Sequence, residues 1–303
     1  MNLSYVFHLP FGSAEYDVGM IKIIPLIVLW GFVSCASLPY TIEDRKFDKA
    51  KQMIEEGADV NETSDCFHAL TIAAMEGDEG LVKLLLDKGA KVTNRSKECD
   101  YTDRIGPFKM RFRWGARTAL DRVANAKIAK LLLAKGANPN IAGYREYSFG
   151  PDYDSALWNA VRIADLELVK VLVEAGANVN VYNKSGKNAI WEMAEARKSQ
   201  GKPEFLSYLQ SKGMKNLEIT DAKAKATDGK VLTKYKHVAT GAVTEMSSEI
   251  AKGVYENPKN YSALTMNAAD GAYYHYAEFV WVETGQNLYE WYLLRKKKTG
   301  TLK

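Results

Sequence analysis

The chain has 303 residues, of which 47% are hydrophobic and 26% are charged, and its formal net charge is +4. These values are ordinary for a globular protein of about two domains, and they exclude a disordered or collagen-like chain. Such a weak positive charge does not by itself indicate a nucleic-acid partner. The three cysteines and four histidines lack the spacing of a closed zinc site, so we expect no metal and no cofactor.

An apolar run of 11 residues, Ile23 to Val33, follows a lysine near the N-terminus. Its length fits the core of a secretory signal and is shorter than the ~20 residues that span a bilayer. The small residue before Cys35 resembles the lipobox of bacterial lipoproteins, which implies lipidation of Cys35, although Phe32 replaces the usual aliphatic residue. Cleavage after Ala36 is the alternative.

We therefore expect residues 1–36 to form a signal segment. It would place the protein in the periplasm, on the outer membrane as a lipoprotein or, alternatively, outside the cell. Residues 1–19 contain acidic residues and no lysine or arginine, unlike the start of a signal, so we expect translation to begin at Met20. An uncleaved N-terminal anchor or a buried core segment is the other interpretation.

Two short patterns recur through the middle of the chain. The first follows an apolar helix end and begins with glycine: Gly57-Ala58-Asp59-Val60-Asn61, Gly89-Ala90-Lys91-Val92, Gly136-Ala137-Asn138-Pro139-Asn140, Gly176-Ala177-Asn178-Val179-Asn180 and the degenerate Gly213-Met214. The second lies upstream of the later glycines: His68-Ala69-Leu70, Thr118-Ala119-Leu120, Ser155-Ala156-Leu157 and Asn188-Ala189-Ile190. Patterns in phase at a fixed period indicate a repeat architecture.

This spacing closely resembles the ankyrin repeat. The resemblance implies paired helices stacked into a solenoid over residues 41–214, with four fuller units and one partial unit. Each glycine would end a second helix in the left-handed conformation, and Thr118, Ser155 and Asn188 would cap first helices. Every copy has alanine where the family prefers proline, none has the signature histidine, and the first copy lacks most of its first helix.

The glycines are separated by 32, 47, 40 and 37 residues, whereas regular stacking gives ~33. The surplus lies between Asn94 and Arg117 and between Ala142 and Tyr153, at the finger-loop position of an ankyrin repeat. In the first insert, basic and apolar residues alternate from Phe108 to Trp114, which predicts a short hairpin arm. Residues 91–117 carry eight basic and three acidic residues.

We predict that these inserts bind a protein partner, with an acidic surface or an anionic polymer as the counterpart. Arginine and aromatic residues are enriched at binding hot spots. The predicted contact residues are Arg111, Phe112, Arg113, Trp114, Tyr144, Arg145, Tyr147, Phe149, Tyr153 and Trp158. Alternatively, the aromatic residues fold back onto the repeats and the charges are merely solvated.

After processing, Cys66 and Cys99 remain, one repeat apart on the same edge of the predicted stack. In an oxidising compartment they can form a disulfide. Two free thiols are the alternative.

The repeat pattern stops near Met214, and residues 231–298 are predicted to form a small α+β module. We expect a strand over 231–238, a helix over 242–255 and a hairpin that joins 272–282 to 288–294. Four residues suit acid–base chemistry, namely His237, His275, Glu278 and Glu283, but no catalytic motif accompanies them.

The sequence thus predicts a mainly α protein, an ankyrin-repeat solenoid followed by a small α+β module. We expect a monomeric, non-enzymatic scaffold of the bacterial cell envelope that binds a protein partner. Nucleic acid does not fit an exported chain, and membrane contact would occur only through a lipid anchor. The alternatives are an enzyme with a catalytic C-terminal module and substrate-recruiting repeats, or a secreted effector.

Overall fold

The computed structural model describes residues 37–105, 108–115, 117–146, 153–220, 231–238, 240–258, 265–267 and 273–302. The predicted signal segment, with Met20 and Cys35, lies outside these residues. The chain from Ser37 onward forms one compact unit. No helix in the described ranges is long and apolar enough to cross a membrane.

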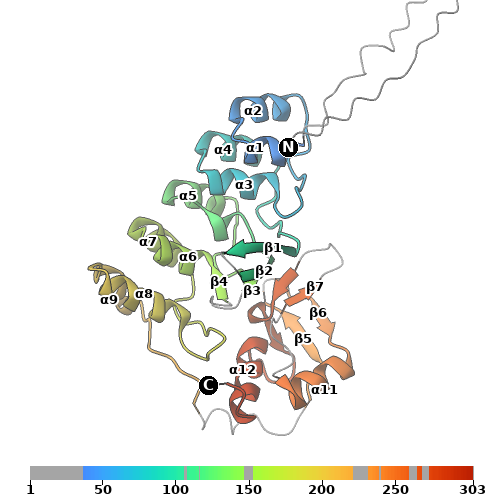
Figure 1. The fold of residues 1–303 in the computed structure, drawn as a ribbon, viewed down its shortest axis with the longest axis vertical. Helices are drawn as coiled ribbons and strands as arrows, with labels where there is room; N and C mark the ends of the chain where they lie inside the picture. Colours follow the sequence, from blue (N-terminus) through green and yellow to red (C-terminus); the bar gives the residue numbers. More distant parts are fainter. Residues whose placement is uncertain are drawn as a thin grey trace, which may run out of the picture. The chain divides into compact units, whose positions relative to one another are not determined.

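The described chain contains five helix pairs in succession (Figure 1). They are α1 (Leu38–Glu43) with α2 (Phe47–Glu55), α3 (Ala69–Glu76) with α4 (Glu79–Asp87), η2 (Leu120–Arg122) with α5 (Ala126–Ala134), α6 (Ala156–Ile163) with α7 (Leu166–Glu174), and α8 (Ala189–Ser199) with α9 (Glu204–Ser211). Successive pairs contact each other, α1 with α3, α2 with α4, α4 with α5, α5 with α7 and α6 with α8. The pairs are therefore stacked in a row, as the resemblance implies.

One hydrophobic cluster runs through all five pairs. Its second helices contribute buried leucines such as Leu85, Leu132 and Leu172, while small residues such as Ala73 and Ala160 let the first helices approach each other. A single pair cannot cover its own apolar face, so each pair depends on its neighbours for stability.

The expected glycine conformation is confirmed at every repeat. Gly57, Gly89, Gly136, Gly176 and Gly213 have φ of 95°, 91°, 87°, 89° and 88°, the left-handed region that terminates a helix. Ser155 and Asn188 also cap α6 and α8 as predicted.

Two details of the predicted repeats are wrong. Thr118 does not cap a helix with its side chain; its backbone N–H instead donates to Asp121 Oδ2 at 2.7 Å, next to the short 3-10 turn η2. The first unit does have a first helix, α1, which begins at Leu38 and not after residue 41. Leu38 is fully buried, so this short helix is held by packing against its neighbours.

The asparagine that ends three of the repeat motifs, Asn61, Asn140 or Asn180, links neighbouring units, which the sequence analysis did not anticipate. Asn140 Nδ2 donates to Gly176 O at 2.9 Å, and Asn140 Oδ1 accepts from the Asn178 N–H at 2.7 Å. Asn180 makes the same two bonds to Gly213 O and to the Lys215 N–H. Each amide side chain thus pairs with one backbone carbonyl and one backbone N–H just after the second helix of the next unit.

The chain after residue 230 contains β5 (Lys234–His237), β6 (Val243–Glu245), α11 (Ser248–Glu256), β7 (Thr265–Asn267), β8 (Tyr273–His275), η4 (Tyr276–Glu278), β9 (Phe279–Trp281) and α12 (Leu288–Lys298). The strand order is β6-β5-β9, and β7 pairs with β8. A second hydrophobic cluster forms around Trp281, Trp291 and Leu293. We call residues 231–302 the C-terminal module.

Two predictions in this module are wrong. The helix predicted over 242–255 starts only at Ser248, because Val243 belongs to strand β6. The predicted hairpin does not form either, since residues 288–298 are helix α12 and β9 pairs with β5 instead. Helix α12 is buried on most of its sides, so its aromatic-rich sequence lacks the periodicity of a surface helix.

Candidate protein-binding surface

The two inserts form a single four-stranded antiparallel sheet. Its strands are β1 (Cys99–Ile105), β2 (Phe108–Gly115), β3 (Ala142–Glu146) and β4 (Tyr153–Ser155), in the order β1-β2-β3-β4. The predicted hairpin in the first insert is confirmed. The pairing of β2 with β3, from Arg113↔Glu146 to Gly115↔Tyr144, joins the two inserts and was not predicted.

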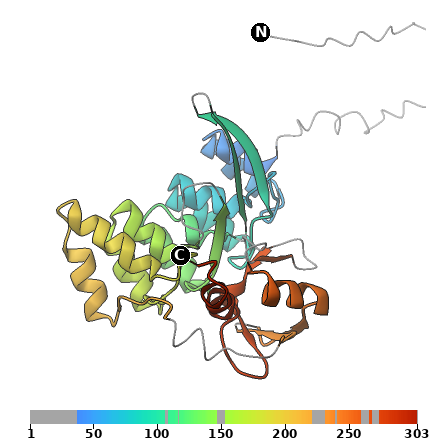
Figure 2. The same cartoon turned by 60° about the horizontal axis from the view of Figure 1, so that its bottom comes forward.

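The hairpin of β1 and β2 is longer than the rest of the sheet. Its register runs from Cys99↔Trp114 to Ile105↔Phe108, whereas β2 pairs with β3 only from Arg113 to Gly115. We call residues 100–113 the arm; Figure 2 shows it as a long two-stranded ribbon. Successive positions of a strand alternate between the two faces of a sheet, so the positions of Lys109, Arg111 and Arg113 lie on one face and those of Phe108, Met110 and Phe112 on the other.

The structure places most of the predicted contact residues on this sheet. Arg111, Phe112, Arg113 and Trp114 belong to β2, Tyr144 and Arg145 to β3, and Tyr153 to β4. Tyr147 and Phe149 lie outside the described residues.

Trp158 must be withdrawn from the predicted contact set. It lies in α6, where only 4% of the residue is exposed, and it packs in the hydrophobic cluster of the repeats. The Arg162 guanidinium carbon lies 5.8 Å from the centre of its ring. A large aromatic residue at this position stabilises the repeat and is not accessible to a partner.

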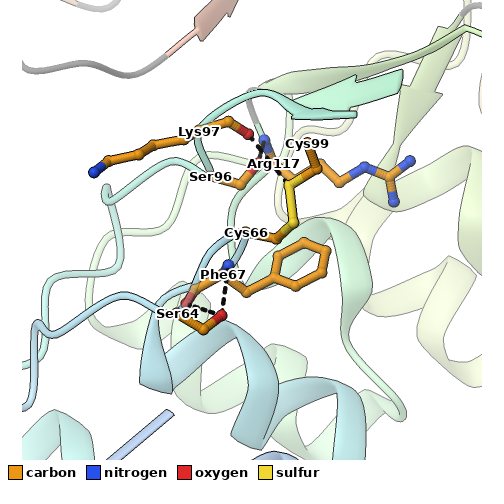
Figure 3. Close-up of a disulfide and its surroundings, with 7 residues drawn as sticks. All are labelled: Ser64, Cys66, Phe67, Ser96, Lys97, Cys99 and Arg117. Carbon is orange, nitrogen blue, oxygen red and sulfur yellow. Dashed lines mark hydrogen bonds between the residues drawn. A yellow bond between two sulfur atoms is a disulfide. The ribbon is translucent and has the colours of Figure 1, made fainter. Parts of the chain in front are cut away.

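A disulfide between Cys66 and Cys99 fixes the base of the arm (Figure 3). Cys66 lies in the loop before α3 and Cys99 is the first residue of β1, with 5.5 Å between their Cα atoms. Beside the disulfide, the Ser96 N–H donates to Arg117 O at 2.8 Å, and the Arg117 N–H donates to Ser96 Oγ at 3.0 Å. Of the two states left open for these cysteines, the structure shows the disulfide.

The C-terminal module contacts the loops that join successive helix pairs. We call residues 88–119, 135–155 and 175–188 the finger loops. Arg95 of the first loop forms a bidentate ion pair with Glu278, with Nη1 2.8 Å from Oε1 and Nη2 in contact with Oε2. Strand β3 of the second loop contacts β8, and Tyr182 of the third packs against the hydrophobic cluster of the module.

Two of the four residues considered for acid–base chemistry lie together. His237 Nε2 lies 3.4 Å from Glu278 Oε2, and His237 Nδ1 lies 2.9 Å from Thr240 Oγ1. Both residues are 8% exposed, and Glu278 already binds Arg95. The pair therefore belongs to a buried ionic network between two parts of the chain. Glu283 is exposed, and of His275 only the backbone is described.

Within the described ranges, no group of three or more His, Cys, Asp or Glu side chains could hold a metal ion. A cavity of about 340 Å³ lies between the repeats and the C-terminal module. It is lined mainly by Asn140, Asn178, Asn180 and Tyr182 from the repeats and by Asn287, Tyr289 and Glu290 from the module. The two parts therefore do not fill the space between them.

Stacked helix pairs, each ended by a left-handed glycine and joined by projecting loops, define a helical-repeat protein. The family model of the ankyrin repeat matches residues 65–97 and 152–184, which contain α3–α4 and α6–α7. These two segments are therefore similar to ankyrin repeats, which generally bind protein partners and are generally non-catalytic. A comparison with the curated proteins gives no match.

Proposed function

We propose that this chain is a non-enzymatic scaffold of the bacterial cell envelope that captures a protein partner through the sheet β1–β4. The observation that carries the proposal is the union of both inserts in one sheet attached to the repeats. A row of stacked repeats is stiff, and a binding element fixed to it loses little conformational entropy when a partner binds.

The composition of the arm favours an acidic partner surface. Lys109, Arg111 and Arg113 occupy alternating positions on β2, and the intervening positions hold Met110 and Phe112. Arginine beside aromatic residues is typical of binding hot spots, and a basic strip accelerates encounter with an acidic surface.

Two features support export to the envelope. Disulfides such as Cys66–Cys99 persist in oxidising compartments and are rare in the cytosol. Both proposed processing sites, before Cys35 and after Ala36, also lie upstream of α1, which begins at Leu38. Processing at either site would leave every described helix intact.

Affinity capture from envelope extracts, followed by titration of the purified partner, tests the proposal. We expect Arg111→Ala combined with Arg113→Ala to weaken binding at least about tenfold, because two hot-spot candidates are removed. The matched control is Lys49→Ala with Lys83→Ala, which removes two exposed lysines from α2 and α4. The control should bind within about twofold of the unchanged protein.

Each variant must keep the Cys66–Cys99 disulfide and the melting temperature of the unchanged protein. Equal partner binding by the arm variant and the control variant would exclude the arm as the binding element.

A further inference from the structure

Besides the contact between β3 and β8, the C-terminal module is attached to the finger loops at two separate places. At one of them, the buried Arg95–Glu278 ion pair joins the first finger loop to η4. The Glu278 carboxylate also faces His237, whose ring packs 5.0 Å from that of Phe279. The Glu278 carbonyl accepts from the Val238 N–H at 2.9 Å, so the acid is fixed within the module.

The second attachment is at Gly186 in the third finger loop. A Cβ atom on this residue would lie 2.8 Å from Leu302 Cδ2 and 2.9 Å from Ile219 Cγ1, so no side chain fits there. Leu302 and Ile219 both belong to the hydrophobic cluster of the module. Ile219 precedes the module in the chain, and its N–H donates to Gly186 O at 2.8 Å, so the segment that leads to the module is also held against the third finger loop.

We propose that the C-terminal module is an autoinhibitory cover of the finger loops, held by these two contacts, and that a partner reaches the loops only when the cover opens. This inference rests on the proposed function, because it concerns access to the same side of the repeats. The module contacts all three finger loops, so it occupies positions that a partner of the repeats would otherwise use.

The chemistry of the interface suits a contact that opens. Its buried ion pair fixes one arrangement but adds little net stability, because both charges lose their hydration. The cavity of about 340 Å³ leaves part of the interface without packing contacts. The repeats and the module also keep separate hydrophobic clusters, so each retains its own core when they part.

The first test is hydrogen exchange of the full chain carrying Glu278→Gln. The substitution keeps the shape of the side chain but replaces the carboxylate that faces the buried Arg95 charge with a neutral amide, which favours opening. We expect at least about tenfold faster exchange in residues 175–188 and 215–220, with unchanged exchange in α3 and α4, which belong to the repeat core. The control is Glu256→Gln, which removes an exposed carboxylate of α11.

The second test opens the cover without changing a charge. Gly186→Ala inserts a Cβ against Leu302 and Ile219. Its control is Gly201→Ala, because Gly201 has a similar φ, +78° against +74°, and nothing lies within 4 Å of the added carbon. We expect Gly186→Ala to accelerate exchange in the same segments at least about tenfold, whereas Gly201→Ala adds only the backbone strain.

The partner purified by envelope capture is then titrated with the opened variants. If the open form is the competent one, apparent affinity rises with its population, so both should bind at least about tenfold more tightly. Hydrogen exchange that stays slow in both variants would overturn the proposal that the module is a cover that opens. Fast exchange with unchanged or weaker binding would also overturn it, because the module would then be part of the binding surface.

Failure of the unchanged protein and of both opened variants to capture any partner would refute the proposed function. The exchange measurements would still decide whether the module opens.

Discussion

Single side chains in this protein often form hydrogen bonds with several backbone groups at once. Asn188 is 1% exposed, and its Oδ1 accepts from the N–H groups of Ile190 and Trp191 at the start of α8. Its Nδ2 donates to Val179 O and Lys215 O, so one amide joins the last two repeats. The sequence indicated the cap but not the second role, because the partners are distant in sequence.

Burial of Tyr235 gives a prediction about pH at the residue scale. Burial raises the pKa of Tyr235 above its ordinary value of ~10, because the folded core disfavours the phenolate. The unfolded chain therefore releases this proton at a lower pH than the folded chain. The contribution to stability is present below pH ~10 and is lost as the pH rises through the folded pKa.

Urea unfolding of the unchanged protein and of Tyr235→Phe, from pH 8 to pH 11, measures this effect. We expect the free energy of unfolding of the unchanged protein to fall more steeply above pH ~10, by at most about 1.4 kcal/mol per pH unit. Parallel pH profiles of the two proteins would contradict the prediction.

At the scale of elements, the arm depends on what holds its base. Within the described residues, the parts of β1 and β2 that lie far from this base pair only with each other. An isolated two-stranded hairpin is marginally stable in water. The Cys66–Cys99 disulfide and the pairing of β2 with β3 supply the missing support.

Removing the disulfide should therefore loosen the arm and lower stability. The cysteines are 33 residues apart, and closing a loop of this length in the unfolded chain contributes about 3–4 kcal/mol. We expect Cys66→Ser with Cys99→Ser to lose that amount in urea unfolding and to exchange faster over β1 and β2. The unchanged protein should show the same loss when a reductant is added, and the double variant should not respond to it. Stability that is insensitive to reductant in both would contradict the role of the disulfide.

At the scale of the whole molecule, the proposed localisation to the cell envelope depends on the N-terminal segment. The Leu38 N–H donates to Glu62 Oε2 at 3.0 Å and its side chain is fully buried, so the chain is fixed to the repeats from this residue onward. A lipid on Cys35 would therefore hold the repeats close to a membrane surface.

Mass analysis of the mature protein, isolated from cells that express the full sequence, tests this localisation. We expect the mature chain to begin at a lipid-modified Cys35 and to fractionate with membranes, and Cys35→Ala to release it from that fraction. A chain that begins at Ser37 would contradict lipidation but not export. A soluble cytosolic chain with its first residues intact would contradict export.

The sequence by itself determined the local and periodic features of this protein. The phased glycines, the leucine-rich helix ends and the alternation from Phe108 to Trp114 are short-range signals, and they predicted the stacked pairs and the hairpin because local backbone preferences suffice for both. Only the tertiary structure decided the union of the two inserts, the burial of Trp158, the helix at Leu288–Lys298 and the Arg95–Glu278 contact. Each of these features depends on contacts between residues that are distant in sequence. Burial of such residues is an effect of the tertiary structure and produces no periodic pattern in the sequence.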